Sequence, residues 1–255
     1  MRLVRNNGYI RYRKRRARLT AFAGFVFLVS AVAITFLYPT LFIPGYGLLI
    51  LGFITFNMGM QQSTKWSRHP RPDELLVEAL RRLNDRYTLI HYPAAGRGKP
   101  GHVLVYPGGM IVITTREVPG KVTVDGNKWR RVGGNKLWML VGMSAPQLGN
   151  PTIENEEDRK ALEAILDEHG LSGGDTIDGL IAFLNPQIEL DVESSDLTVV
   201  DGDNLLRAVR ELSSETVLPT KDRELIIGVL AEGDDVEGPA SLATRTAGAK
   251  RARAA

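Results

Sequence analysis

The first 72 residues carry one long apolar pattern. Between Leu19 and Thr64 no position holds a charged side chain. A helix that crosses a bilayer needs about 20 apolar residues, because the hydrocarbon core is about 30 Å thick. Leu19–Tyr38 and Leu41–Met60 both meet that length, and the segment from Pro39 to Gly45 contains two prolines and a glycine, which favours a turn. The pattern therefore predicts two antiparallel transmembrane helices over residues 19–38 and 41–60.

Two other interpretations fit the apolar run less well. Ala31-Val32-Ala33 resembles a signal-peptide cleavage site after a basic segment, but the apolar run continues through Leu37 and a second span follows at once. A buried hairpin of a soluble domain is the other alternative. A run from Leu19 to Thr64 without one charge argues against it.

Residues 61–72 form a polar linker, and the periodicity changes after it. Asp73–Arg86 has a helical apolar face, and Glu154–His169 is a second amphipathic helix that ends at Gly170. Turn residues separate β-rich runs in two hairpins, with Pro107-Gly108-Gly109 in the first and Asp125-Gly126-Asn127 in the second. The expected strands are Thr88–His91, His102–Tyr106, Met110–Thr115, Lys121–Val124, Lys128–Arg131, Leu137–Val141, Ile181–Leu184 and Leu197–Val200, and the remaining helices are Asn204–Leu212 and Lys221–Leu230.

This order of elements predicts an α/β domain with a mixed sheet over residues 73–233. About 160 residues are enough for one hydrophobic core. Residues 234–255 are rich in Gly, Ala and charge without apolar periodicity, and we expect them to be disordered.

Charge divides the chain in two. Residues 1–72 hold 11 basic and no acidic side chains, whereas residues 73–255 hold 21 basic and 29 acidic ones. Residues 1–18 therefore form a basic arm directly before the first span. By the positive-inside rule both termini are cytoplasmic, in a multi-pass protein of the cell (inner) membrane. The arm is interpreted as a topology determinant and a contact for anionic lipids, with a nucleic-acid patch as the alternative; it contains Arg11, Arg13, Lys14, Arg15, Arg16 and Arg18.

Composition also removes several kinds of site. The chain contains no cysteine, which excludes disulfides, cysteine-ligated zinc and a thiol nucleophile. The four histidines, His69, His91, His102 and His169, are too scattered for a zinc signature. We therefore expect no metal site from this pattern.

From Asp73 to Leu212 the chain resembles the nuclease-related domain (NERD), a branch of the PD-(D/E)xK, restriction-endonuclease-like superfamily. No single piece carries the resemblance, but the ordered set does. The matching pieces are Glu74 with the Leu80, Leu83 and Tyr87 pattern, the hairpin from His102 to Ile113 around Pro107-Gly108-Gly109, the Gly120-Lys121-Val122 segment, Asp125-Gly126 with Trp129, and Asn150-Pro151 before a long helix. The resemblance implies a restriction-endonuclease-like mixed-sheet domain after the two-helix transmembrane hairpin.

The resemblance also implies where catalysis takes place in the family. An Asp before the hairpin and a Glu-x-Lys at its end hold Mg²⁺ and activate water. In this sequence the three positions are Gly101, Thr114 and Arg116, and a Gln expected in the later helix is Glu154. Glycine offers no ligand, threonine is a weak ligand for a hard cation, and arginine stays protonated.

The sequence thus favours a pseudoenzyme, a membrane-anchored binding or scaffolding module without a cofactor. Its expected partners are the bilayer and another protein at the cytoplasmic face. One alternative is a Mg²⁺- or Mn²⁺-dependent nuclease with a relocated site at Glu74 and Glu154. Another is a nucleic-acid tether that uses Lys128, Arg130 and Arg131. Residues 73–239 hold 17 basic and 29 acidic side chains, and this net charge of −12 opposes DNA binding.

Overall fold

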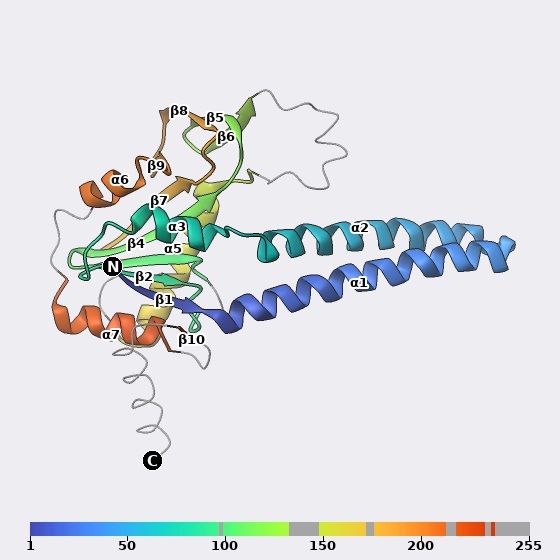
Figure 1. The fold of residues 1–255 in the computed structure, drawn as a ribbon, viewed down its shortest axis with the longest axis horizontal. Helices are drawn as coiled ribbons and strands as arrows, with labels where there is room; N and C mark the ends of the chain where they lie inside the picture. The colour runs from blue at the N-terminus through green and yellow to red at the C-terminus, as the bar shows by residue number, and fades with distance from the viewer. Residues whose placement is uncertain (97–98, 133–147, 172–175, 213–217, 233–235, 238–255) are drawn as a thin grey trace, which may run out of the picture. The chain divides into compact units, whose positions relative to one another are not determined.

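The computed structural model describes residues 1–96, 99–132, 148–171, 176–212, 218–232 and 236–237 (Figure 1). It divides into two compact units. One is formed by Met1–Tyr9 together with the chain from Pro72 onward, and the other consists mainly of Ile10–Arg71. The N-terminal residues therefore belong to the same unit as the predicted α/β domain.

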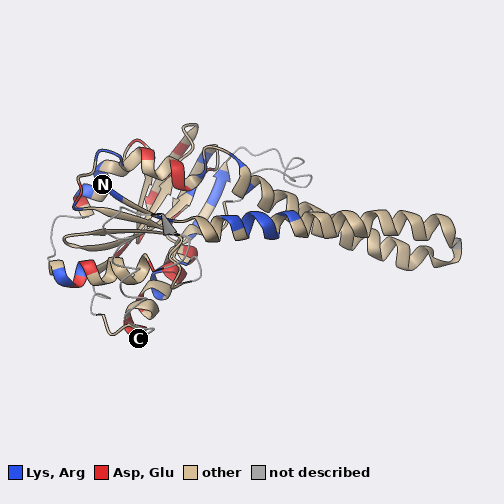
Figure 2. Cartoon of the chain, turned by 60° about the horizontal axis from the view of Figure 1, so that its bottom comes forward, with Lys and Arg blue, Asp and Glu red and all other residues tan. Residues whose placement is uncertain are grey.

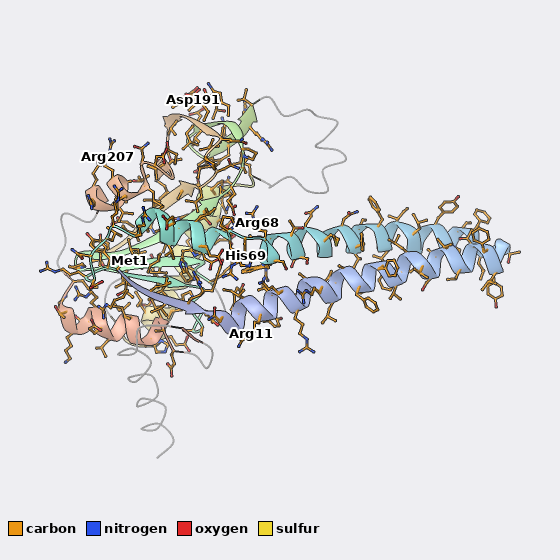
Figure 3. All side chains as sticks on the ribbon, in the orientation of Figure 1. Met1, Arg11, Arg68, His69, Asp191 and Arg207 are labelled. Carbon is orange, nitrogen blue, oxygen red and sulfur yellow. The ribbon has the colours of Figure 1, made fainter. Side chains whose placement is uncertain are left out.

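The second unit is a pair of long helices. Helix α1 (Asn7–Leu37) and helix α2 (Phe42–Ser67) are joined by a single 3₁₀ turn, η1 (Pro39–Leu41). Both helices are long and apolar enough to cross a bilayer. Most of their large apolar side chains are exposed and extend outward along both helices (Figure 3). Charge is confined to the first turns of α1 and the end of α2, and the helices between are uncharged (Figure 2).

A seam of small residues holds the two helices together. Every seventh residue is buried on each helix, namely Ile10, Ala17, Gly24 and Ala31 on α1, and Gly45, Gly52, Gly59 and Trp66 on α2. A seven-residue repeat is typical of left-handed coiled packing. Glycine is needed at the closest points, because a Cβ atom at Gly24 would lie 2.2 Å from the Phe56 backbone N.

The first unit is built on a seven-stranded mixed sheet in the order β10-β1-β2-β3-β4-β7-β9. Its strands are β1 (Arg2–Asn6), β2 (Thr88–His91), β3 (His102–Tyr106), β4 (Gly109–Arg116), β7 (Ile177–Phe183), β9 (Thr198–Asp201) and β10 (Val236–Glu237). A three-stranded sheet, β6-β5-β8, contains β5 (Gly120–Asp125), β6 (Lys128–Val132) and β8 (Ile188–Ser194).

Helices cover both faces of the large sheet. On one face Val103 and Val105 pack against α5 (Pro151–Glu168) and α7 (Thr220–Leu230). On the other face Leu104 and Tyr106 pack against α3 (Pro72–Leu80) and α6 (Leu205–Leu212). Because side chains alternate along a strand, neighbouring strand residues belong to different cores.

Most predicted elements are present, and the mixed α/β class is confirmed. The structure differs from the sequence expectations in several places. Helix α1 begins at Asn7, inside the predicted arm, and α2 continues to Ser67, through part of the predicted linker. Residues 2–6 of the predicted arm form β1, α3 ends at Leu80 instead of continuing to Arg86, Ile188–Ser194 forms an unpredicted strand, and Val236–Glu237 of the predicted tail pairs with β1. The predicted strand Leu137–Val141 lies outside the described residues.

Candidate functional site

The three positions to which the resemblance assigns the family's catalytic residues, called the family positions below, lie along one helix in the structure. Gly101 directly precedes β3, and Thr114 and Arg116 lie near the end of the neighbouring strand β4. Thr114 and Arg116 are two residues apart and so face the same side of the sheet. All three contact helix α5, which covers that side.

Helix α5 is placed by its first residues. Asn150 is the N-cap, and its side chain accepts hydrogen bonds from the backbone N–H groups of Thr152 and Ile153. Pro151 follows at the first helical position, where its missing N–H costs nothing. Trp129 of β6 donates to Thr152 Oγ1 at 2.9 Å and stacks on Phe183. These contacts orient the first turns of α5 toward β4.

At the first family position, a carboxylate of α5 contacts the backbone of Gly101. The Gly101 backbone N–H donates to Asp158 Oδ2 at 3.0 Å. A Cβ atom at Gly101 would have only that oxygen within 4 Å, at 3.8 Å. The Asp158 carboxylate therefore lies next to the space that a longer side chain at residue 101 would enter.

Burial shapes the protonation of this carboxylate. Asp158 is 6% exposed, and desolvation raises the pKa of its carboxyl above the usual range. The hydrogen bond from Gly101 opposes that rise, while the negative charge of Glu154 one turn away adds to it. Burial thus makes the ionised form of Asp158 less favourable in the folded protein than in water.

At the second position, Thr114 is buried and hydrogen-bonded to Asn155. The Thr114 side chain is 4% exposed, and its Oγ1 accepts a hydrogen bond from Asn155 Nδ2 at 3.0 Å. The same amide nitrogen donates to the backbone carbonyls of Val112 and Leu180, in β4 and β7. The fully buried Asn155 therefore connects α5 to strands β4 and β7.

At the third position, Arg116 forms an ion pair with α5. Its guanidinium lies 2.5 Å from Glu154 Oε2 and donates to the carbonyl oxygen of Leu148 at 2.8 Å. The Arg116 side chain is mostly buried, whereas half of Glu154 is exposed. A permanent cation fixed by these partners cannot serve as a base.

Glu74 does not join this site. It lies on α3, whose buried residues Leu76 and Leu80 pack on the opposite face of the sheet from α5. Glu74 and Glu154 therefore belong to helices on opposite faces of the sheet, and their pairing in a relocated site stays a hypothesis. The acidic side chain that does lie near Glu154 is Asp158, one helical turn further along α5.

The histidines are less scattered in space than in sequence. His91 of β2 and His102 of β3 are register partners, and their Nδ1 atoms lie 2.8 Å apart, both buried. One nitrogen must donate and the other accept, so the pair is a direct hydrogen bond. In the described part of the chain no three His, Asp or Glu side chains are grouped as metal ligands.

The candidate nucleic-acid residues are divided between two faces of β6. Lys128 and Arg130 are exposed on one face, while Arg131 alternates to the face that Trp129 occupies. On the same small sheet, Lys121 forms ion pairs with Glu189 and Asp191 of β8. The three basic residues therefore do not form one surface, and acidic side chains lie on the same sheet.

Comparison with known proteins agrees with the resemblance. Residues 71–184 match the model of the family described as nuclease-related domain, and this segment of the chain is a nuclease-related domain. No curated protein matches the chain, and no solved structure does. The matched segment contains the three family positions and the whole of α5, which contacts them.

Two residues of the site were not predicted from the sequence, Asn155 and Asp158. Helical spacing does place Asp158 beside both of the others, four positions after Glu154 and three after Asn155. What the sequence did not reveal is that this side of the helix lies against Gly101 and Thr114.

Proposed function

We propose that this chain is a membrane-anchored, non-catalytic module that presents its nuclease-related domain at the cytoplasmic face, where it binds another protein. The proposal is supported mainly by the identity of the residues at the three family positions. Gly101, Thr114 and Arg116 stand where the family has Asp, Glu and Lys, and each of them contacts a polar side chain of α5.

The chemistry of these contacts argues against metal-dependent cleavage. Mg²⁺ prefers several oxygen ligands with carboxylates among them, and an attacking water needs a group that can take up or orient its proton. Asp158 and Glu154 supply carboxylates, but one accepts from Gly101 and the other is paired with Arg116. No described group at these positions replaces the family lysine as a base.

The sheet supports an even number of membrane crossings. Strand β1 precedes α1 in the chain and pairs in parallel with β2, which follows α2. Residues on both sides of the helical pair therefore belong to one sheet, which supports their placement on one side of the bilayer. The basic residues that flank the spans favour the cytoplasm for that side.

A cleavage and binding assay tests the catalytic part of the proposal. The purified full chain in neutral detergent is incubated with DNA and RNA, with Mg²⁺ or Mn²⁺, and the products are separated on a denaturing gel. We expect uncut nucleic acid, and no salt-sensitive binding when the same oligomers are titrated by fluorescence anisotropy. The double variant Asp158→Asn/Glu154→Gln is the control for a contaminating nuclease.

The outcomes separate the alternatives. Metal-dependent cleavage that disappears in the double variant would replace the proposal with an enzyme whose carboxylates come from α5. Binding that weakens steeply with salt, with intact oligomers, would replace it with a nucleic-acid tether. A reporter that is active only in the cytoplasm, fused after Ala255, tests the orientation, and an extracytoplasmic signal there would overturn it.

A further inference from the structure

Helix α1 carries a basic groove just before its uncharged part. The groove has a volume of about 390 Å³ and is lined by Arg11, Lys14, Arg15, Arg18, Leu19 and Phe22. The first four are at positions i, i+3, i+4 and i+7, so their side chains share one face of the helix. The two apolar residues continue that face toward the span.

The groove lies beside the helical seam and is open to the outside of the helical pair. Ala17, between the lining residues in sequence, is fully buried in the seam, while Arg15, Arg18, Leu19 and Phe22 are exposed. The neighbouring Arg13 lies on the seam side, with its guanidinium 5.4 Å from the centre of the Trp66 ring. The basic arm therefore has two chemically different sides, one that packs on α2 and one that is open.

Three of the cations in the groove, Lys14, Arg15 and Arg18, come from a part of the chain without acidic residues. Residues 1–72 contain no Asp or Glu, so the two long helices supply no carboxylate to Lys14, Arg15 or Arg18. Closely spaced cations repel one another, and an anion between them relieves the repulsion. The groove thus has a cationic end toward the N-terminus of α1 and an apolar end at the start of the uncharged segment.

We propose that this groove binds the phosphate of an anionic phospholipid, whose acyl chains lie along Leu19 and Phe22. The proposal rests on the membrane insertion proposed above. A basic cluster next to a span attracts anionic lipid. Each one or two cations near the surface raise the affinity for that lipid about tenfold. The apolar rim favours a lipid over a nucleic acid, because a phosphodiester backbone has no chain to place against Phe22.

The test measures lipids retained by the purified full chain. Native mass spectrometry in neutral detergent counts bound phosphatidylglycerol and phosphatidylcholine with identical acyl chains. We expect preferential retention of phosphatidylglycerol by the wild type. In Arg15→Gln/Arg18→Gln its apparent affinity should fall by about 30-fold, from the loss of two interfacial cations. The charge-matched control Arg13→Gln/Arg16→Gln should lose clearly less affinity than Arg15→Gln/Arg18→Gln, because neither of its side chains lines the groove.

Further experiments identify the ligand and test membrane anchoring separately from lipid binding. Soluble glycerol phosphate should compete poorly; equal competition would overturn the lipid assignment in favour of a free phosphate ester. A DNA oligomer that displaces the lipid, with the same dependence on Arg15 and Arg18, would also overturn it. Equal retention of both lipids, or equal loss in both double variants, would refute the groove while leaving anchoring intact. Anchoring itself fails only if the wild type is extracted from membranes by alkaline carbonate.

Discussion

The helical seam gives the sharpest prediction about the anchor. Gly24 and Gly59 are the closest points between α1 and α2, since a Cβ atom at either would lie 2.2 Å from a backbone nitrogen of the partner helix. Gly47, on α2, has no atom within 4 Å of such a Cβ. Gly24→Ala and Gly59→Ala should therefore destabilise the helical pair, whereas Gly47→Ala should not.

The magnitude follows from the distances. Ordinary van der Waals contact begins at 3.4 Å, so the helices must separate by about 1.2 Å at the substituted point. Backbone atoms cannot move aside as a flexible side chain could. Overpacking of this kind costs about 1–3 kcal/mol. In lipid the loss is not offset by a hydrophobic gain, because helix association there depends on close packing.

The assay is an SDS titration of the full chain in neutral detergent micelles. Trp66 lies in the seam and stacks with Arg13, so its fluorescence reports separation of the helices. Trp129→Phe and Trp138→Phe remove the other tryptophans in every variant. Gly47→Ala controls for the helix propensity that alanine adds anywhere. If Gly24→Ala and Gly59→Ala stay within about 0.5 kcal/mol of Gly47→Ala, the tight seam is refuted.

Two further predictions concern the site. Asp158→Asn should stabilise the protein at neutral pH, because burial raises the pKa of the wild-type carboxyl and its contribution to stability is lost as the pH rises through that pKa. Urea unfolding at several pH values should show the gain shrinking toward acid, and a constant gain would contradict this. Asn155→Leu should lower the free energy of unfolding by about 2–3 kcal/mol, since Thr114 and two strand carbonyls lose their donor. An unfolding midpoint equal to that of the wild type would show that these hydrogen bonds contribute nothing net.

Local patterns predicted most of the elements that carry the site. The hairpin of β3 and β4 follows from β-rich runs on both sides of Pro107-Gly108-Gly109, and α5 begins where Asn150-Pro151 supplies an N-cap and a first helical residue. Strand β8 was missed although Ile188, Leu190 and Val192 alternate with polar residues. That alternation is a strand signal, obscured by the acidic residues between.

Other features depend on contacts that are distant in sequence. Strand β1 is five residues long with arginine at two of them, and it becomes a strand because β2 and β10 pair with it. The site has the same origin. The side of α5 that carries Asp158 can be deduced from helical spacing, but its approach to Gly101 depends on how the helix packs across the sheet.

The changes at the three family positions form a matched set with α5. Restoring an aspartate at Gly101 would bring a second carboxylate toward the buried Asp158. Restoring a glutamate at Thr114 would place a charge in the buried site that Asn155 fills. A lysine in place of Arg116 would lose the bond to the Leu148 carbonyl and the fork geometry that pairs with Glu154. Each of these three substitutions would disturb a contact with α5 unless α5 changes too, so the residues at these positions and the contacting side of the helix depend on one another.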